Sequence, residues 1–282
     1  MTRGRTNHLI IIAVVSIVGF LVGFGIAPRP VALQPLPVPD HISQVAYSGP
    51  LILTNVNQSV LGAETIDPVD FVNEINKARE QAGSPPLRLS TTLMRAANMR
   101  AQVIQKYQNF SHQDPHEGIE LGTVLPKLNY HFTYATENIG MGGVSAPDFV
   151  NGFMHSTTHK ANLLDPTLTD TGAAFVDGRY KQYYVNYAVQ LFAIPGGREE
   201  YLGYKDHDRE LYEAELAAVK AHLHPLVWAV GFIRRNPLYT GGYRTKLMKQ
   251  KRILETVLTR MRESQPLNNA DVALILEFNT LL

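Results

Sequence analysis

The chain has 282 residues, 45% of them apolar and 18% charged, which is typical of a globular protein with room for one sizeable domain and extensions. Its formal net charge of +1 provides no overall attraction for nucleic acid. The absence of cysteine excludes disulfides and thiolate metal sites, so a metal could be held only by His, Asp or Glu.

Residues 9–26 contain no charged side chain and predict a transmembrane helix. A helix of this length spans about 27 Å, close to the thickness of a bilayer's hydrocarbon core. Arg3 and Arg5 precede the span and only Arg29 follows nearby, which favours a cytoplasmic segment 1–8 and an exported remainder. The alternative is a signal peptide cleaved after residue 27, which would give a secreted protein. Pro28 is unfavourable directly after such a site, so we expect a single-pass signal anchor in the cell membrane.

Residues 27–65 are rich in proline, which removes backbone donors and keeps a chain extended. They predict a linker that lifts the following domain off the membrane. A short apolar run at 51–53 is compatible with an edge strand docked on that domain.

The next segment predicts a mixed domain. Asp67, placed before a proline, caps a helix whose apolar face includes Val69, Val72 and Ile75. Ser90 caps a second helix. Residues 172–176 and 183–192 predict two strands, and in the second the apolar and aromatic residues at every other position from 183 to 191 alternate with residues that include Asn186 and Gln190, as in a sheet with one covered face. The fold class predicted from these patterns is α+β.

Residues 198–282 predict a C-terminal helical extension. Tyr212, Leu216 and Val219 share one helical face, and comparable stripes follow to the end of the chain, so we expect a hairpin or bundle packed on itself or on the domain. Residues 226–233 are apolar but too short for a second membrane span. From 234 to 262 there are nine Lys or Arg and one acid, which indicates either a solvated helix face or attraction to anionic lipid or wall polymer.

Three separated clusters carry the groups able to bind a metal or move a proton: FSHQDP at 110–115, TENIG at 136–140 and GFMHSTTHKAN at 152–162. Together with Gly172 and the strand after it, they resemble the CAP or SCP-like superfamily of cysteine-rich secretory, antigen 5 and pathogenesis-related proteins, in its bacterial form. The resemblance covers residues 66–195. It implies a three-layer α-β-α sandwich with a cleft at one edge.

The resemblance also implies the residues of the cleft. His112, Glu137 and His159 match three of the family's two His and two Glu, and we expect them to converge from a loop, a turn and a helix. Ser156 stands where eukaryotic relatives carry the second Glu, so their full tetrad does not transfer to this chain. His155 lies four residues before His159, which on one helix would place both side chains on the same face.

The chemistry of these residues leaves three interpretations open. The histidines could hydrogen-bond to Glu137 and brace the cleft, as buried polar groups must be paired. His112, Glu137 and His159 could instead bind zinc or another divalent cation, with His155 as an extra ligand, or they could act as acid and base without a metal. A hydrolase using Ser156 and His159 would also need an oxyanion hole, and the sequence contains no identifiable one.

Two functions from different classes follow from the sequence. The first is a membrane-anchored extracytoplasmic binding module whose cleft takes a lipid, a cell-wall component or a protein. The second is a metal-assisted hydrolase that acts on peptide or cell-envelope polymer. Neither involves nucleic acid.

Overall fold

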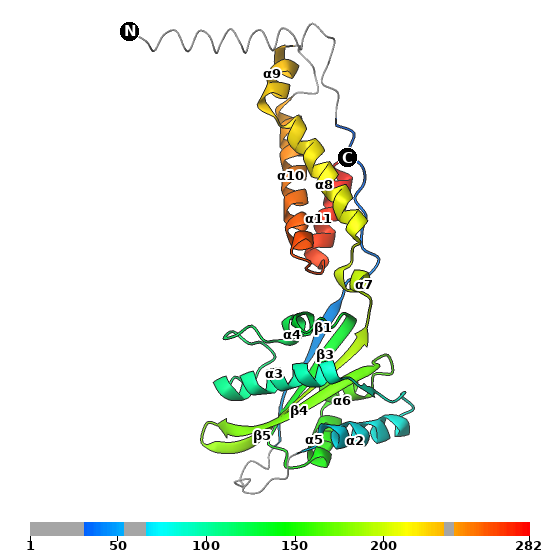
Figure 1. Ribbon diagram of the computed structural model, residues 1–282, viewed down its shortest axis with the longest axis vertical. Helices are drawn as coiled ribbons and strands as arrows, with labels where there is room; N and C mark the ends of the chain where they lie inside the picture. The colour runs from blue at the N-terminus through cyan, green and yellow to red at the C-terminus, as the bar shows by residue number, and fades with distance from the viewer. Residues whose placement is uncertain (1–30, 54–65, 234–239) are drawn as a thin grey trace, which may run out of the picture. The chain divides into compact units, whose positions relative to one another are not determined.

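The computed structural model describes residues 31–53, 66–233 and 240–282 (Figure 1). These residues form two compact units. We call His41–Tyr201 the sheet unit, and residues 31–40 together with Leu202–Leu282 the helical unit.

The sheet unit is built on five strands in the order β1-β3-β5-β4-β2. The central strand β5 is antiparallel to both β3 and β4, whereas β1 and β2 are parallel to their neighbours at the two edges. The predicted strands 172–176 and 183–192 lie within β4 and β5, so both strands are confirmed. The expectation that the second has one covered face is wrong, because residues 185–193 are all buried. The strands are β1 Gln44–Ile52, β2 Arg88–Leu89, β3 Phe132–Met141, β4 Asp170–Tyr180 and β5 Tyr183–Pro195.

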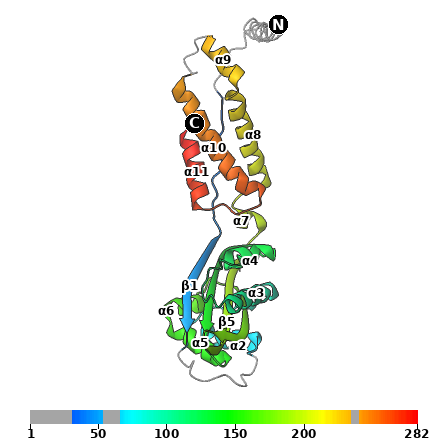
Figure 2. The same cartoon turned by 90° about the vertical axis from the view of Figure 1, so that its left-hand side faces the viewer.

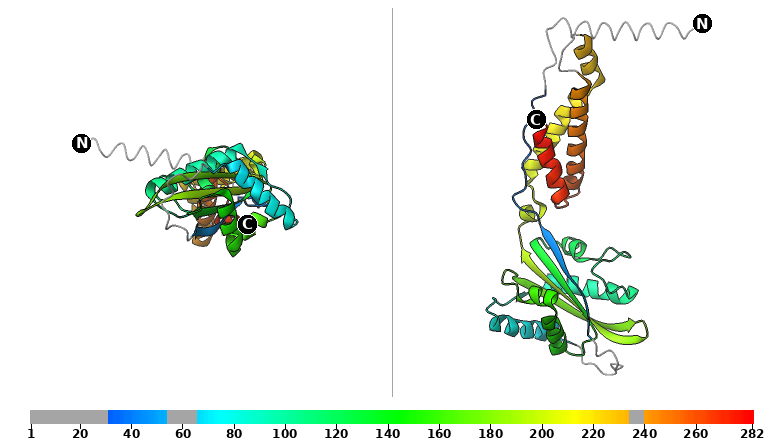
Figure 3. Two further views of the ribbon diagram at one scale, coloured as in Figure 1. Left: turned by 90° about the horizontal axis from the view of Figure 1, so that it is seen from below. Right: turned by 180° about the vertical axis from the view of Figure 1, so that it is seen from behind.

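Helices cover both faces of this sheet (Figures 2 and 3). On one face α3 lies against β4 and β5; on the other, α2 contacts β4, and α6 contacts β1 and β3. Phe71, Phe149, Phe153 and Phe192 are fully buried in the core between the second group of helices and the sheet. The α+β class is therefore confirmed. The helices of this unit are α2 Pro68–Gln81, α3 Thr91–Tyr107, α4 Leu121–Lys127, α5 Ala146–His155 and α6 Thr157–Leu164.

The edge strand β1 comes from the segment for which the sequence alone predicts a linker. It pairs with β3 from Gln44 onward and so extends well beyond the short run at 51–53. A β-bulge between Tyr47 and Pro50 interrupts the pairing, and Gly49 adopts a positive φ of 86° there. Glycine tolerates this conformation without steric cost.

The helix that the sequence predicts around His159 is divided in two. Ser156 has extended backbone angles, φ −98° and ψ 124°, and it ends α5 and begins α6. His155 and His159 are consequently on different helices, and the face-sharing expected from their four-residue spacing is wrong.

The helical unit has its own core, formed by α8, α10 and α11. The predicted stripe residues Tyr212, Leu216 and Val219 are buried in it, together with Leu254 and Phe278. The helices of the C-terminal part are α7 Arg198–Leu202, α8 Asp206–His222, α9 Pro225–Ile233, α10 Gly241–Arg262 and α11 Asn269–Thr280.

Residues 31–40 are attached to this helical core. The Leu36 backbone exchanges two hydrogen bonds with the Asn279 side chain, of 2.7 and 2.9 Å, and the Tyr212 hydroxyl donates to the Pro37 carbonyl at 2.8 Å. The extended, proline-rich backbone leaves its polar groups open to such side chains. This part of the predicted linker is thus packed along the helices.

No helix among residues 31–53, 66–233 and 240–282 combines the length and apolarity needed to cross a bilayer. The predicted transmembrane helix, residues 9–26, lies outside those ranges.

Candidate functional site

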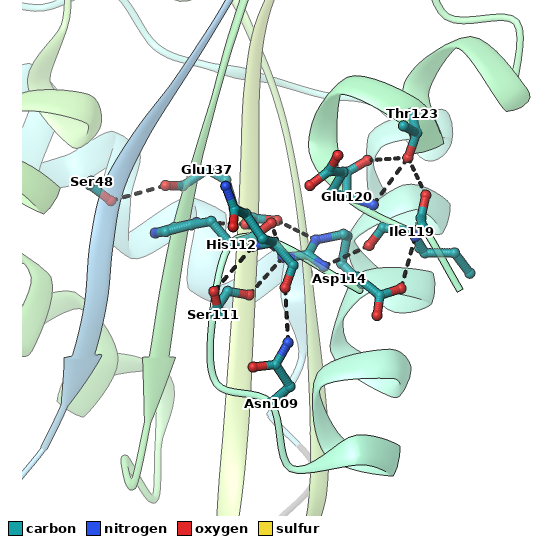
Figure 4. Close-up of polar contacts among 12 residues, drawn as sticks. Ser48, Asn109, Ser111, His112, Asp114, Ile119, Glu120, Thr123 and Glu137 are labelled. Carbon is teal, nitrogen blue, oxygen red and sulfur yellow. Dashed lines mark hydrogen bonds and ion pairs between the residues drawn. The ribbon is translucent and has the colours of Figure 1, made fainter. Parts of the chain in front are cut away.

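The candidate site lies where β1 and β3 run side by side. Glu137 is on β3, His112 is in the loop after α3, and Ser48 is in the bulge of β1 (Figure 4). The sequence alone predicts a turn for Glu137; the structure places it in the middle of a buried strand, opposite Tyr47.

Both carboxylate oxygens of Glu137 are engaged within the protein. Arg100 donates to Oε2 through Nε at 2.8 Å and to Oε1 through Nη2 at 3.0 Å, and His112 Nδ1 donates to Oε1 at 2.7 Å. The side chains of Arg100 and Glu137 are completely buried. Burial alone would raise the pKa of Glu137, but the His112 hydrogen bond and the Arg100 charge hold it below its usual value. Glu137 is thus an ionised partner in a buried ion pair.

Arg100 also organises the loop that carries His112. Its guanidinium donates to the carbonyls of Ile119 at 2.6 Å and of Ser111 and His112 at 3.1 Å. Sequence analysis missed this residue. The sequence did contain a signal for it, because Arg100 lies on the apolar face of α3, beside Ala96 and Ile104. An arginine on an apolar helical face requires a buried partner.

The same loop is closed by a second buried carboxylate (Figure 4). Asp114 accepts hydrogen bonds from the backbone nitrogens of His116, Glu117 and Ile119 at 3.0, 3.2 and 2.8 Å. Burial opposes ionisation, but these backbone donors keep the pKa of Asp114 below its ordinary value. Asp114 therefore fixes the loop geometry that presents His112.

His159 lies on α6, beyond the edge of β3. Its Nδ1 shares a 2.8 Å hydrogen bond with Ser156 Oγ, its ring stacks on Phe153 at 5.1 Å, and its carbonyl accepts from Asn138 Nδ2 at 3.2 Å. Burial lowers the pKa of His159, and this effect outweighs the backbone groups of Gly49 and Ile139, which raise it. Neutral imidazole is therefore the stable form of His159 at neutral pH.

The remaining nitrogens of the two histidines share one property. Nε2 of His112 and Nε2 of His159 are both buried, and neither has a hydrogen-bond partner within the part of the chain that the structure describes. An unpaired buried polar atom is costly, so each nitrogen is suited to accept a partner from outside the protein.

β1 covers the edge where the resemblance predicts an open cleft. The Ser48 hydroxyl lies 2.9 Å from both the Glu137 carbonyl and Asn138 Oδ1, which share its single proton, and Thr158 Oγ1 donates to the Ser48 carbonyl at 2.7 Å. The Tyr47 ring lies 4.9 Å from the ring of His112. His112 and His159 are consequently only 8% and 2% exposed.

His155 is not brought into the site. Its side chain is exposed, and its Nδ1 is hydrogen-bonded to the carbonyl of Asn151 at 2.8 Å. The break at Ser156 turns the helix axis between the two histidines, which is why their sequence spacing is misleading. His155 is corrected from candidate ligand to helix-surface residue.

The site does not assemble the three-ligand metal centre that the sequence suggests. Glu137 has both oxygens occupied by Arg100 and His112, and the described ranges contain no group of three or more His, Asp or Glu arranged to hold an ion. The residues do not fit a zinc site made of His112, Glu137 and His159, because the carboxylate would have to leave its arginine.

A serine hydrolase triad is not assembled either. Ser156 and His159 Nδ1 are within hydrogen-bond distance. A triad also needs a carboxylate on the other ring nitrogen, and among the described residues none bonds to His159 Nε2. Glu137 orients His112 instead.

Comparison with known proteins identifies the domain. A model of CAP, the cysteine-rich secretory protein family, matches residues 72–192. The uncharacterized protein YkwD of Bacillus subtilis is 27% identical over 124 residues, which are 44% of this chain and 48% of that protein. The chain therefore spans about half the length of this curated relative.

Solved structures overlap with the same half of the chain. An extracellular SCP-domain protein from Bacillus anthracis is 24% identical with a TM-score of 0.38, over 45% of this chain and 40% of that one. An outer surface protein from Borrelia burgdorferi is 19% identical with a TM-score of 0.41, over 48% of this chain and 99% of that one. The family predicted from the three motifs is confirmed by the family match: residues 72–192 belong to the CAP family of cysteine-rich secretory proteins.

Proposed function

We propose that this chain is a membrane-anchored extracytoplasmic binding module whose ligand is an extended segment of another protein. The membrane anchor is the uncharged span 9–26, and the positive charges before it favour export of the CAP domain. Of the three ligand classes that the sequence leaves open, protein has the best structural support.

The observation that carries this proposal is the placement of β1. An extended segment from outside the matched region 72–192 is held along the outer edge of β3, between the elements that carry His112 and His159. The edge of β3 thus has the shape and the backbone hydrogen-bonding groups to accept a parallel strand, which is how many modules bind peptides. The chain's own strand acts as the resident ligand.

The chemistry of the site also favours binding over turnover. The metal-assisted hydrolase needs a carboxylate free to bind an ion or to take a proton from water, whereas Glu137 neutralises the buried Arg100. The two unpaired Nε2 atoms can form hydrogen bonds with a bound segment without any change in the ion pair.

A labelled peptide with the sequence of residues 44–53 tests the proposal. In the wild type, β1 competes intramolecularly for the same edge, so added peptide should bind weakly. Ser48→Ala removes the hydroxyl that bonds the bulge to Glu137 and Asn138, which weakens the resident strand by about 1 kcal/mol and leaves the surface that receives the peptide unchanged. Fluorescence anisotropy should then show that Ser48→Ala binds the peptide about five-fold more tightly than the wild type does.

Two controls accompany this measurement. Thr157→Ala alters an exposed neighbour of Thr158 and should leave the wild-type affinity unchanged. A scrambled peptide of the same composition should bind neither protein. If Ser48→Ala is folded and its β1 amides exchange faster with deuterium, yet it binds the peptide no better than the wild type, the edge is not a peptide site and the proposal fails.

A further inference from the structure

Helix α9 in the helical unit has an unusual surface. Its nine residues, PLVWAVGFI, include no polar or charged side chain, yet Pro225 and Ala229 are exposed and Leu226 is 42% exposed. Surface helices of soluble proteins normally carry a polar face. A helix that presents apolar side chains to its surroundings marks a contact with another protein or with a membrane.

The position of α9, close to the first described residues of the chain, favours a membrane over another protein as its partner. The backbone nitrogen of Val31 donates to the hydroxyl of Tyr243 at 3.3 Å, and the ring of Tyr243 lies 6.2 Å from that of Trp228 in α9. The proposed membrane span ends at residue 26, five residues before Val31. Five residues reach about 18 Å at most, so an anchored chain holds this end of the helical unit close to the bilayer.

The charges next to α9 suit an anionic surface. The guanidinium of Arg244 lies over the Trp228 ring at 5.7 Å, and Lys246 follows half a turn later. The first turn of α10, where Arg244 stands, contains no acidic residue. A tryptophan within an apolar helix and an arginine beside it are a combination typical of helices that lie in a membrane interface.

We propose that α9 lies in the interfacial zone of the membrane that carries the anchor, with Leu226 and Trp228 among acyl chains and Arg244 at anionic phospholipid headgroups. This inference rests on the membrane anchor of the proposed function. At nine residues α9 is too short to span the bilayer, and it would lie along the surface.

The chain offers a direct probe, because Trp228 is its only tryptophan. The full-length protein would be reconstituted in vesicles of phosphatidylcholine and phosphatidylglycerol, prepared either with ordinary or with brominated acyl chains, and floated on a density gradient. Bromine quenches indole fluorescence only at contact. We expect Trp228 emission to be at least about two-fold weaker in the brominated vesicles.

Leu226→Asp places a charge on the exposed face of α9 and should restore most of the emission while the protein still floats. Leu276→Asp is the matched control: Leu276 is 50% exposed on α11 of the same unit, and its replacement should leave the quenching unchanged. Wild-type protein that floats but is not quenched would overturn the inference and leave the anchor in place. Protein that fails to float would overturn the anchor, and the docking of α9 with it.

Discussion

Arg100→Met is expected to lower the free energy of unfolding by about 3–5 kcal/mol, because it leaves the carboxylate of Glu137 buried without its counter-charge. The substitution keeps the volume of the side chain's apolar stem, so the loss comes from the missing charge and from three backbone carbonyls that lose their donor. Urea denaturation of the two proteins measures the difference.

Lys77→Met is the control for this result. Lys77 pairs with Glu74 at 2.7 Å, and the two side chains are 65% and 38% exposed, so its removal should cost less than about 1 kcal/mol. Arg100→Met/Glu137→Leu removes both buried charges and should recover part of the loss. A loss below about 1 kcal/mol for Arg100→Met alone would contradict the assignment of Glu137 as a structural ion-pair partner.

Gly172→Ala is expected to destabilise the sheet unit by about 3 kcal/mol or more. A Cβ at this position would overlap the backbone nitrogen of Met94 and the carbonyl carbon of Leu93, at the start of α3. Backbone atoms inside a helix cannot turn aside as a flexible side chain can, so α3 would have to move off β4. Thermal unfolding followed by circular dichroism should show the loss.

Gly122→Ala provides the comparison. The nearest atom to a Cβ at Gly122 is Val45 Cγ2 at 3.8 Å, which is ordinary contact, and the residue lies in α4. Alanine there should change the stability by no more than about 1 kcal/mol, in the stabilising direction. Equal unfolding temperatures for Gly172→Ala and the wild type would contradict the close packing of α3 against β4 in the structure.

The parts of the fold that the sequence predicts are those with a regular apolar period. The alternation of residues 183–192 identifies β5, and the stripe of Tyr212, Leu216 and Val219 identifies α8. β3 escapes this reasoning because Glu137 and Asn138 stand in the middle of a buried strand, where their partners come from distant elements. Periodicity describes one element and cannot show a neutralising partner on another.

The candidate site shows the same limit. Motif order correctly brings His112 to Glu137, but Arg100, which decides the charge state of the carboxylate, belongs to none of the motifs. Val69 shows how local pattern fails at a helix end: it was assigned to the apolar face, yet it is 44% exposed and its neighbour Phe71 is buried. The buried face of α2 runs through Phe71, Val72 and Ile75, and Val69 lies off that face.

The central claim is that Glu137 belongs to a structural ion pair, so that the two histidines bind a ligand and not a catalytic metal. Calorimetric titration of the full chain with zinc at about pH 7.5, where unperturbed histidine is neutral, tests it most directly. We predict no saturable site that distinguishes the wild type from His112→Ala and His159→Ala. A one-site isotherm in the wild type and in His155→Ala, lost in the other two variants, would contradict the claim and establish the metal centre.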